Sequence, residues 1–473
     1  MALPDVHLTV QDGGLGSIAA QLDNAALVIG CSSAGAEATP GTFTDAKALV
    51  AAYGYGPGVA LASLILAVAG RPVIFAKADT STAGDVGSAT KFGTGTSAMT
   101  PAELDAAGPN DQYDVIVTVL RGGTIGTDPC TVSISLDGGR TSAGPYAVPL
   151  SPATVTIPDT NVKFTCGAGT LVAGDTYSFS TTAPVASTAN VSACIEAFAA
   201  TTLQASLIFD AGEREGADVT TYDGDLATLA SAYRYARLIT SAFNVDVGTE
   251  ADWIAALLSD FAPVSSLRVG VGAGQARIYD PTMKTQALRP VVWSVMARLV
   301  ATKSHVDAGR VADGALRYTT ELQHDERVVQ GLDDGRFITA RTIIGMPGVF
   351  CTNPNLMAPP GSDYSLIQYG RVMDKVCTNS RAYFILSLND SVRLTPSTGY
   401  ILEKDAQGLE RGNDARLSAT VLADGNASAC TTTVSRTDNI SATKTVHVSV
   451  AVVPVGYMKT IDVTLSFVNP ASA

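Results

Sequence analysis

The sequence is poor in charge for its length. Its 473 residues include 31 Lys and Arg and 44 Asp and Glu, so charged side chains make up 16% of the chain and the net charge is −13. Typical globular domains carry about 25% charged residues. A chain so poor in basic residues is not expected to bind nucleic acid, because neutralising phosphates takes clustered Lys and Arg. The 46% hydrophobic residues exclude a largely disordered protein.

Cysteine and histidine are also scarce. The seven cysteines are scattered, and no pair has the spacing of a zinc site. Such a set is typical of reduced thiols in a cytoplasmic product. The four histidines include no HExxH pair. His324 precedes two acidic residues, but neighbours in sequence do not face one another on a helix. We therefore predict that His324, like His305, is a surface or packing residue.

Signals for export, membrane insertion and catalysis are missing as well. The first residues lack the basic region and apolar core of a signal peptide. The longest apolar run, 59–69, is shorter than the roughly 20 residues that span a bilayer. Residues 30–35 have the glycine spacing of a phosphate-binding loop, but Ala36 and Glu37 replace its lysine and hydroxyl residue. The sequence therefore predicts no catalytic, cofactor-binding or metal-binding residues and no membrane segment.

Two stretches of the chain alternate between apolar strands and helices. In the first, an apolar strand at Ala26–Gly30 leads to a helix that Asp45 caps and then to an apolar helix at Pro57–Ala69. The second stretch, 187–344, has the same alternation, with one of its helices expected at 225–237. Strand, helix and strand in this order are typical of a crossover between parallel strands.

Between these stretches the period of the sequence changes. Residues 80–111 are rich in Gly, Thr, Ser and Ala, a composition that indicates a linker. Residues 112–182 hold short alternating segments separated by glycine turns, which predicts a small all-β sandwich or barrel. Because helix–strand alternation resumes afterwards, we predict an α/β domain that is split by an all-β insertion.

The last third of the chain predicts helices at 362–390 and 397–421 and two strands at 430–435 and 444–453. The expected fold class is therefore α/β plus α+β, with a C-terminal helical and β-hairpin domain. The expected divisions are an N-terminal arm (1–20), an α/β domain in two parts (21–85 and 186–350), a linker with the all-β insertion (86–185), a C-terminal inner domain (351–455) and a C-terminal arm (456–473).

Both ends of the chain alternate between apolar and polar residues, as half-buried strands do. The apolar positions are Val6, Leu8 and Val10 at one end and Ile461, Val463, Leu465 and Phe467 at the other. A two-stranded hairpin alone is marginally stable and leaves its edges unpaired. The two ends either fold back onto the chain's own hairpin or complete the hairpins of neighbouring subunits by strand addition. For the second arrangement, the expected acceptor positions are Thr432, Val434, Val446, Val448 and Val450.

Three stretches near the ends of the chain carry a family resemblance. The first is the opening strand and helices through Gly70-Arg-Pro-Val-Ile-Phe75, the second runs from Ser362-Asp-Tyr364 to Lys375, and the third runs from Val446-His-Val-Ser-Val450 to Asp462. They resemble the contractile tail sheath proteins of bacteriophages and related injection machines, particularly a diverged branch of them. The middle of the chain matches that family only in its architecture.

The resemblance implies a structural subunit that stacks in rings around a tail tube and contracts passively to drive the tube through the target envelope. It implies partners among the tail tube, baseplate and tail terminator proteins. The subunit would be made in the host bacterial cytoplasm and end in the phage tail. The insertion would face outward and the C-terminal domain would face the tube. The candidates for tube contact are Lys404, Glu410, Arg411 and Arg416, which a solvated helix face explains equally well.

Two other functions fit the same features. A self-assembling surface or adhesin-like protein would use the β insertion to bind a receptor, although such a protein normally carries a secretion signal. An α/β enzyme without a recognisable motif would form a small closed oligomer instead of a tube.

Overall fold

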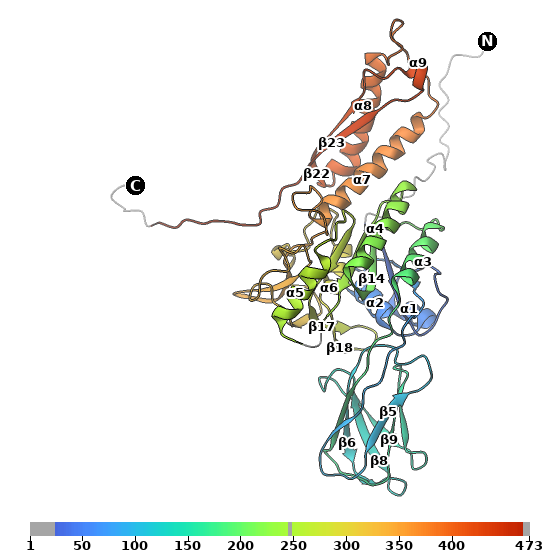
Figure 1. Cartoon of the computed structure of the whole chain (residues 1–473), viewed down its shortest axis with the longest axis vertical. Helices are drawn as coiled ribbons and strands as arrows, with labels where there is room; N and C mark the ends of the chain where they lie inside the picture. The colour runs from blue at the N-terminus through green and yellow to red at the C-terminus, as the bar shows by residue number, and fades with distance from the viewer. Residues whose placement is uncertain (1–23, 245–247, 467–473) are drawn as a thin grey trace, which may run out of the picture.

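The computed structural model describes residues 24–244 and 248–466. Along its longest axis the molecule has three parts, with an all-β part at one end, an α/β part in the middle, and helices with a β-hairpin at the other end (Figure 1). The predicted fold class, a split α/β domain with an all-β insertion and a C-terminal helical and hairpin domain, is confirmed.

A six-stranded sheet forms the centre of the molecule. Its strand order is β16 (Val269–Gly272), β15 (Arg237–Ala242), β14 (Leu207–Arg214), β1 (Ala26–Gly30), β3 (Val73–Lys77) and β2 (Gly41–Phe43). All neighbours are parallel except β2 and β3. β1 pairs with β3 on one side and with β14 on the other, so it joins the two stretches that the insertion separates. Every residue of β1 is buried, as expected for a strand covered on both faces.

Helices cover both faces of this sheet. One face carries α1 (Ala46–Tyr53), α2 (Pro57–Ala69) and α6 (Val292–Ala301), and the other carries α3 (Thr188–Ala199), α4 (Gly216–Ser231) and α5 (Glu250–Phe261). The Asp45 cap is confirmed, since its Oδ1 accepts the Ala48 N–H at 2.8 Å. The helix expected at 225–237 begins earlier, because Glu215 and Asp218 form a capping box at the start of α4. It also ends earlier, at Ser231, and Arg237 belongs to β15.

The start of α2 lies directly against the end of β1. A Cβ added to Gly58 would lie 2.8 Å from the carbonyl carbon of Gly30, and a Cβ added to Gly30 would lie 2.7 Å from the Cα of Gly58. Only glycine at both positions lets the two backbones approach this closely. The glycine that begins the apparent phosphate-loop spacing therefore has a packing role.

The insertion consists of antiparallel sheets packed on a core of their own. The first sheet has the order β4 (Thr90–Phe92), β13 (Thr176–Ser180), β6 (Asp114–Arg121), β8 (Cys130–Ser135) and β9 (Ala143–Val148). The second has the order β10 (Thr154–Ile157), β11 (Val162–Cys166) and β5 (Met99–Glu103). In the third, β7 (Gly123–Thr124) pairs with β12 (Thr170–Leu171). Tyr177 and Phe164 are fully buried in this core. The prediction of a linker at 80–111 is wrong, because this segment contains β4 and β5. Its threonines gave it the composition of a linker, but Thr is β-branched and also suits edge strands such as these.

Two smaller sheets and the C-terminal part complete the chain. The sheets comprise β17 (Gln275–Asp280), β18 (Thr285–Pro290) and β19 (Thr319–Leu322), and β20 (Ala340–Ile343) with β21 (Met346–Cys351). The C-terminal part comprises α7 (Ile367–Phe384), α8 (Glu403–Leu417), β22 (Ala427–Val434), α9 (Ile440–Thr443) and β23 (Val448–Pro454). The two predicted C-terminal helices are present but shorter than expected, and both predicted hairpin strands are present.

Buried Arg–carboxylate pairs hold the outer parts to the central one. Arg289 of β18 makes two hydrogen bonds, of 2.7 and 2.5 Å, to Asp111 at the base of the insertion. Arg237 of β15 reaches α7, where its Nε lies 2.7 Å from Asp374 Oδ2. The four side chains are at most 12% exposed. Because a paired guanidinium and carboxylate have a fixed mutual geometry, these pairs determine how the three parts meet.

Asp374→Ala removes the partner of a buried guanidinium, so we expect it to lower the free energy of unfolding by about 3–5 kcal/mol. The control is the ion pair of Arg393 with Asp405, in which the arginine side chain is 63% exposed. Arg393→Ala is expected to lower the free energy of unfolding by less than about 1 kcal/mol. Denaturant unfolding of the wild type and both variants measures the two losses. Equally small losses would contradict the role given to the Arg237–Asp374 pair.

Candidate assembly site at the C-terminal hairpin and tail

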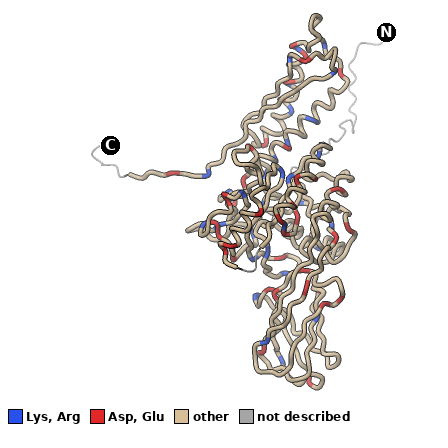
Figure 2. The backbone as a smooth tube through the Cα atoms, in the orientation of Figure 1, with Lys and Arg blue, Asp and Glu red and all other residues tan. Residues whose placement is uncertain are grey.

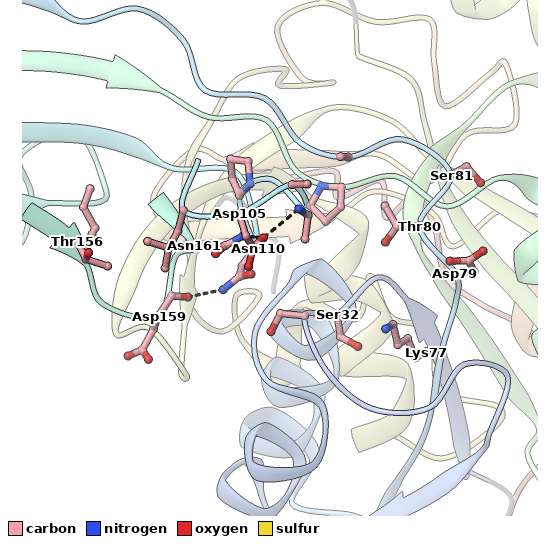
Figure 3. Close-up of a pocket in the computed structure, with 18 of the residues that line it drawn as sticks. Ser32, Lys77, Asp79, Thr80, Ser81, Asp105, Asn110, Thr156, Asp159 and Asn161 are labelled. Atoms are coloured by element: carbon pink, nitrogen blue, oxygen red, sulfur yellow. Dashed lines mark hydrogen bonds between the residues drawn. The ribbon is translucent and has the colours of Figure 1, made fainter. Parts of the chain in front are cut away.

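A polar cavity of about 710 Å³ lies between the central sheet and the insertion (Figure 3). Lys77 lines it from the end of β3, and loops of the insertion line the other side. Asn110 Nδ2 donates to the Asp159 carbonyl oxygen and Asn161 Nδ2 donates to Asp105 Oδ1, both at 2.8 Å. The bonds from Asn161 and from a backbone N–H lower the pKa of Asp105, so this carboxylate does not suit general acid catalysis at neutral pH. The described lining residues include neither His nor Cys. The hydrogen bonds of Asn110 and Asn161 connect loops within the insertion.

Metal ligands do not converge in the described ranges 24–244 and 248–466, where no three His, Cys, Asp or Glu side chains form a group that could hold an ion. The same ranges contain no helix that is both long enough and apolar enough to cross a membrane. All seven cysteines are free thiols, and five of them are buried.

His324 is a packing residue, as predicted, but it contacts Glu326, which the sequence argument had separated from it, and also Glu250. Its Nδ1 lies 2.7 Å from Glu250 Oε1 of α5, and its Nε2 lies 3.0 Å from Glu326 Oε2. The segment is not helical, so residues two apart can lie on the same side. Burial acts to lower the pKa of His324, but the hydrogen bonds to Glu326 and Glu250 outweigh it and raise the pKa. The hydrogen bond between His324 and Glu250 connects the loop that contains His324 to α5.

The β22–β23 hairpin is held against α7 and α8. Val450 and Val452 pack on a small core that includes Val372 of α7. Next to the hairpin turn, Arg436 pairs with two glutamates of α8, at 2.8 Å for Glu403 and 2.5 Å for Glu410. Hydrogen bonding to Arg436 lowers the pKa of Glu403 to about 2 and also lowers the pKa of Glu410. Both ion pairs are therefore intact at neutral pH.

Side chains of α8 close the outer edge of β22. Asp414 Oδ1 accepts the Thr432 N–H, and Glu410 Oε1 accepts the Val434 N–H, each at 2.8 Å. The buried Asn413 also donates to the Thr432 hydroxyl at 2.8 Å. A strand that added to β22 would have to displace two charged acceptors, whose hydrogen bonds are stronger than neutral ones. This edge is therefore closed to strand addition.

The outer edge of β23 has no neighbouring strand in the part of the chain that the structure describes. Val450 lies opposite Thr432 and Val448 lies opposite Val434 in the antiparallel register. Because the N–H groups of Thr432 and Val434 point away from the partner strand, the antiparallel alternation also turns the backbone groups of Val450 and Val448 outward. Among the described residues this sheet has two strands, so no strand lies beside those groups. Val446, the other expected acceptor, precedes β23 and packs against the second small core of the C-terminal part.

The tail after β23 runs away from the body (Figure 1). Residues 455–466 form no helix or strand, and Ile461, Val463 and Leu465 are 71%, 72% and 89% exposed. The strand expected over 461–467 is therefore not formed in the single chain, as far as the described residues extend. An extended segment needs a partner for its backbone before it becomes a strand. The other expected arm positions, Val6, Leu8, Val10 and Phe467, lie outside the described residues.

Two residues fix the start of the tail to the central part of the molecule. The Tyr457 hydroxyl donates to the His305 carbonyl oxygen at 2.5 Å. Lys459 Nζ lies 2.5 Å from Asp307 Oδ2 and 2.7 Å from Asn353 Oδ1. We call these contacts the tail clamp. Because of the clamp, the free part of the tail begins after Lys459 and not at Gly456.

The four candidates for tube contact differ in their surroundings. Charges of both signs are interspersed along the C-terminal part (Figure 2). Lys404 and Arg411 are exposed on α8. Glu410 has a side chain only 17% exposed and is bound to the hairpin through Arg436. Arg416 is half-buried. Glu410 thus has a structural role in the hairpin, and Lys404 and Arg411 are the two that face solvent.

Asp414→Ala is expected to expose the Thr432 amide, because it removes the carboxylate that accepts this N–H. A hydrogen bond to a charged group contributes about 1.5–3 kcal/mol, so amide exchange at Thr432 should become at least about tenfold faster. Hydrogen–deuterium exchange with residue-level resolution measures this rate. The Thr433 amide, which points toward β23, is the internal control and should keep its rate. Unchanged exchange at Thr432 would contradict the closed-edge assignment.

Comparison with family models covers nearly the whole chain. The model described as "DUF2586, N-terminal domain" matches residues 3–355, and the one described as "DUF2586, C-terminal domain" matches residues 363–472. No curated protein matches the sequence.

Solved structures provide a second comparison. A subunit of the anti-feeding prophage helical sheath in its contracted state is 10% identical, with a TM-score of 0.53 over 98% of this chain and 99% of that one. The sheath tail protein of Desulfitobacterium hafniense is 12% identical, with a TM-score of 0.48 over 95% and 100% of the two chains. That of Listeria innocua is 9% identical, with a TM-score of 0.47 over 91% and 95%. The chain belongs to the DUF2586 family, and its fold is that of contractile sheath proteins.

Proposed function

We propose that this chain is a structural subunit of a contractile tail sheath that polymerises by exchanging β-strands between subunits. The single observation that carries the proposal is that one chain contains both a strand edge that can accept a strand and a segment that can form one. β23 has an open edge, and the tail has an exposed stretch of alternating apolar residues without a strand partner among the described residues. The likeness to a contracted sheath subunit supports the same function.

Contraction in this proposal is a passive transition from a metastable extended lattice to a lower-energy packed one. The tails keep neighbouring subunits connected, because main-chain hydrogen bonds hold an added strand firmly. The bodies move as units, because the buried pairs Arg289–Asp111 and Arg237–Asp374 fix their internal joints. No step of this transition requires nucleotide hydrolysis.

The proposed sheath surrounds a tail tube and ends at baseplate and tail terminator proteins, within a phage tail assembled after synthesis in the bacterial cytoplasm. The C-terminal part faces the tube, where Lys404 and Arg411 are the solvent-facing candidates for contact. The insertion lies at the opposite end of the long axis (Figure 1) and faces outward. The N-terminal arm, with Val6, Leu8 and Val10, is a second strand donor. Residues 1–20 and 456–473 thus serve as connecting arms around the domains.

Val463→Asp is expected to prevent polymerisation, because it puts a carboxylate on the apolar face that an added strand would bury. Thr464→Asp introduces the same charge on the opposite face and should polymerise like the wild type. Sedimentation and negative-stain microscopy measure the protein concentration at which polymers appear. We expect it to rise at least about tenfold for Val463→Asp, which corresponds to 1.4 kcal/mol or more of lost association energy.

If both aspartate variants formed tubes at the same protein concentration as the wild type, strand exchange would be contradicted. Thermal unfolding of both variants is the folding control. It should not change, since positions 463 and 464 are exposed in the single chain.

A further inference from the structure

We propose that residues 324–337 form a strap along α5 and that His324 is a proton-dependent latch at the first end of this strap. In the latch, the doubly protonated imidazole of His324 binds Glu250 of α5 and Glu326 of the strap. Loss of the ring proton releases this end of the strap from α5. The inference goes beyond the proposed sheath function and does not depend on strand exchange. We call residues 324–337 the α5 strap.

The α5 strap follows its helix from the first turn to the last. Near the start of α5, the Trp253 ring contacts the His324 ring edge to face, with 5.4 Å between the ring centroids. Near the end of α5, the rings of Phe261 and Phe337 make the same kind of contact at 5.1 Å. Both phenylalanines are buried, so this second contact does not depend on pH. The end that carries His324 is therefore the end that a proton can control.

The chain runs from the α5 strap directly onto an edge of the central sheet. The Ile338 N–H donates to the Val271 carbonyl oxygen of β16 at 2.8 Å, and the Ala273 N–H donates to the Ile338 carbonyl oxygen at 3.0 Å. β16 is the outermost strand on this side of the six-stranded sheet. Because an uncovered strand edge can pair with another chain, the strap positions a residue that covers such an edge.

The geometry of the latch requires a doubly protonated imidazole. Nδ1 of His324 lies 2.7 Å from Glu250 Oε1, and Nε2 lies 3.0 Å from Glu326 Oε2. An ionised carboxylate only accepts hydrogen bonds, so both ring nitrogens have to donate. A neutral imidazole has a single N–H and would turn the lone pair of its other nitrogen toward a carboxylate oxygen. The two bonds therefore exist together only in the imidazolium form.

Both carboxylates of the latch are held in the ionised form. Glu250 lies in the first turn of α5, where the helix dipole favours negative charge. Glu326 Oε1 accepts the N–H groups of Gly331 and Asp333, at 2.8 and 3.1 Å. Burial acts to raise the pKa of Glu326, but the hydrogen bonds from His324 and from these two N–H groups outweigh it and lower the pKa. The proton of the latch is therefore on the imidazole.

The charged groups that face His324 come from two elements. α5 contributes Glu250, and the α5 strap contributes Glu326. The turn that precedes β17 packs against the His324 Cβ with a glycine and adds no charge. Asp325, the next residue along the strap, is bound instead to the backbone N–H and the hydroxyl of Thr342. The protonation of His324 thus decides whether the latch is closed.

Loss of the proton releases Glu250 and not Glu326. The Glu250 side chain is 42% exposed, whereas that of Glu326 is 7% exposed. The exposed carboxylate regains water when its bond breaks, but the buried one would be left without a donor. The remaining N–H of the neutral ring therefore stays on Nε2 with Glu326. The bond that is lost is the one that joins the α5 strap to α5.

The latch closes at low pH and opens at high pH. Burial acts to lower the pKa of His324, but the hydrogen bonds to Glu326 and Glu250 outweigh burial and raise the pKa above 6.5. A group whose pKa is raised on folding adds stability below its unfolded pKa and loses it as the pH rises through the folded pKa. The latch is therefore fully closed below about pH 6.5 and opens as the pH passes the raised pKa.

Glu250→Gln in the full-length protein separates the latch from its proton. The glutamine amide keeps the size of the side chain and both donates and accepts, so a neutral His324 can bind it and Glu326 at once. We expect the pKa of His324 to fall by at least about 0.5 unit in this variant, because an opposite charge is removed. NMR titration of the histidine ring signals measures this pKa. The chain has four histidines, so His324→Gln identifies the signal and the other three are internal controls.

Opening of the α5 strap is measured by hydrogen–deuterium exchange of the amides in residues 325–331, corrected for the intrinsic dependence of exchange on pH. Between about pH 6 and about pH 9, their protection should fall at least about tenfold in the wild type, since a hydrogen bond between charged groups is lost. In Glu250→Gln it should change by less than about threefold, because a neutral latch needs no proton. The Leu238 amide, which donates to the Arg268 carbonyl oxygen in the central sheet, should keep its protection and is the control.

Two results would overturn the latch. The first is a His324 that titrates at or below its ordinary pKa, or whose titration does not change in Glu250→Gln. The second is equal protection of residues 325–331 at both pH values in the wild type, which decides the question even if no variant folds. Neither result bears on the proposed sheath function, because both measurements are made on the central part of a single chain.

Discussion

A two-stranded hairpin cannot satisfy its own outer backbone groups, and within residues 24–244 and 248–466 only one of its two outer edges is covered. Asp414 and Glu410 of α8 accept the outward N–H groups of β22. The equivalent groups of β23 have no strand beside them among the described residues. The two edges of the hairpin therefore differ: one is bound to the chain's own α8, and the other is the edge that the proposed strand exchange uses.

The rest of the molecule keeps that edge in a defined place. Buried Arg–carboxylate pairs join the insertion and α7 to the central sheet, and the tail clamp attaches the start of the tail to the same central part. The free segment therefore begins at a fixed point. In the proposed sheath, such a subunit shifts against its neighbours while its own parts keep their arrangement.

The sequence predicts local features well. The Asp45 cap, the apolar strand Ala26–Gly30 and the interruption by an all-β insertion all follow from short-range patterns. Contacts between distant segments are not accessible in this way. The use of Glu410 as a cap for β22 depends on how α8 lies on the hairpin, and the pairing of His324 with Glu250 joins residues far apart in sequence. The strands within 80–111 were missed because they are short edge strands in a segment whose Gly, Thr, Ser and Ala content is typical of a linker.

The central claim is that the open edge of β23 belongs to the tail of another subunit. Electron cryo-microscopy of polymers formed by the purified chain tests it most directly. The account predicts a third strand beside β23 that traces to residues 461–467 of a neighbouring copy. A reconstruction in which the edge of β23 stays bare, or in which each tail lies on its own hairpin, would contradict it.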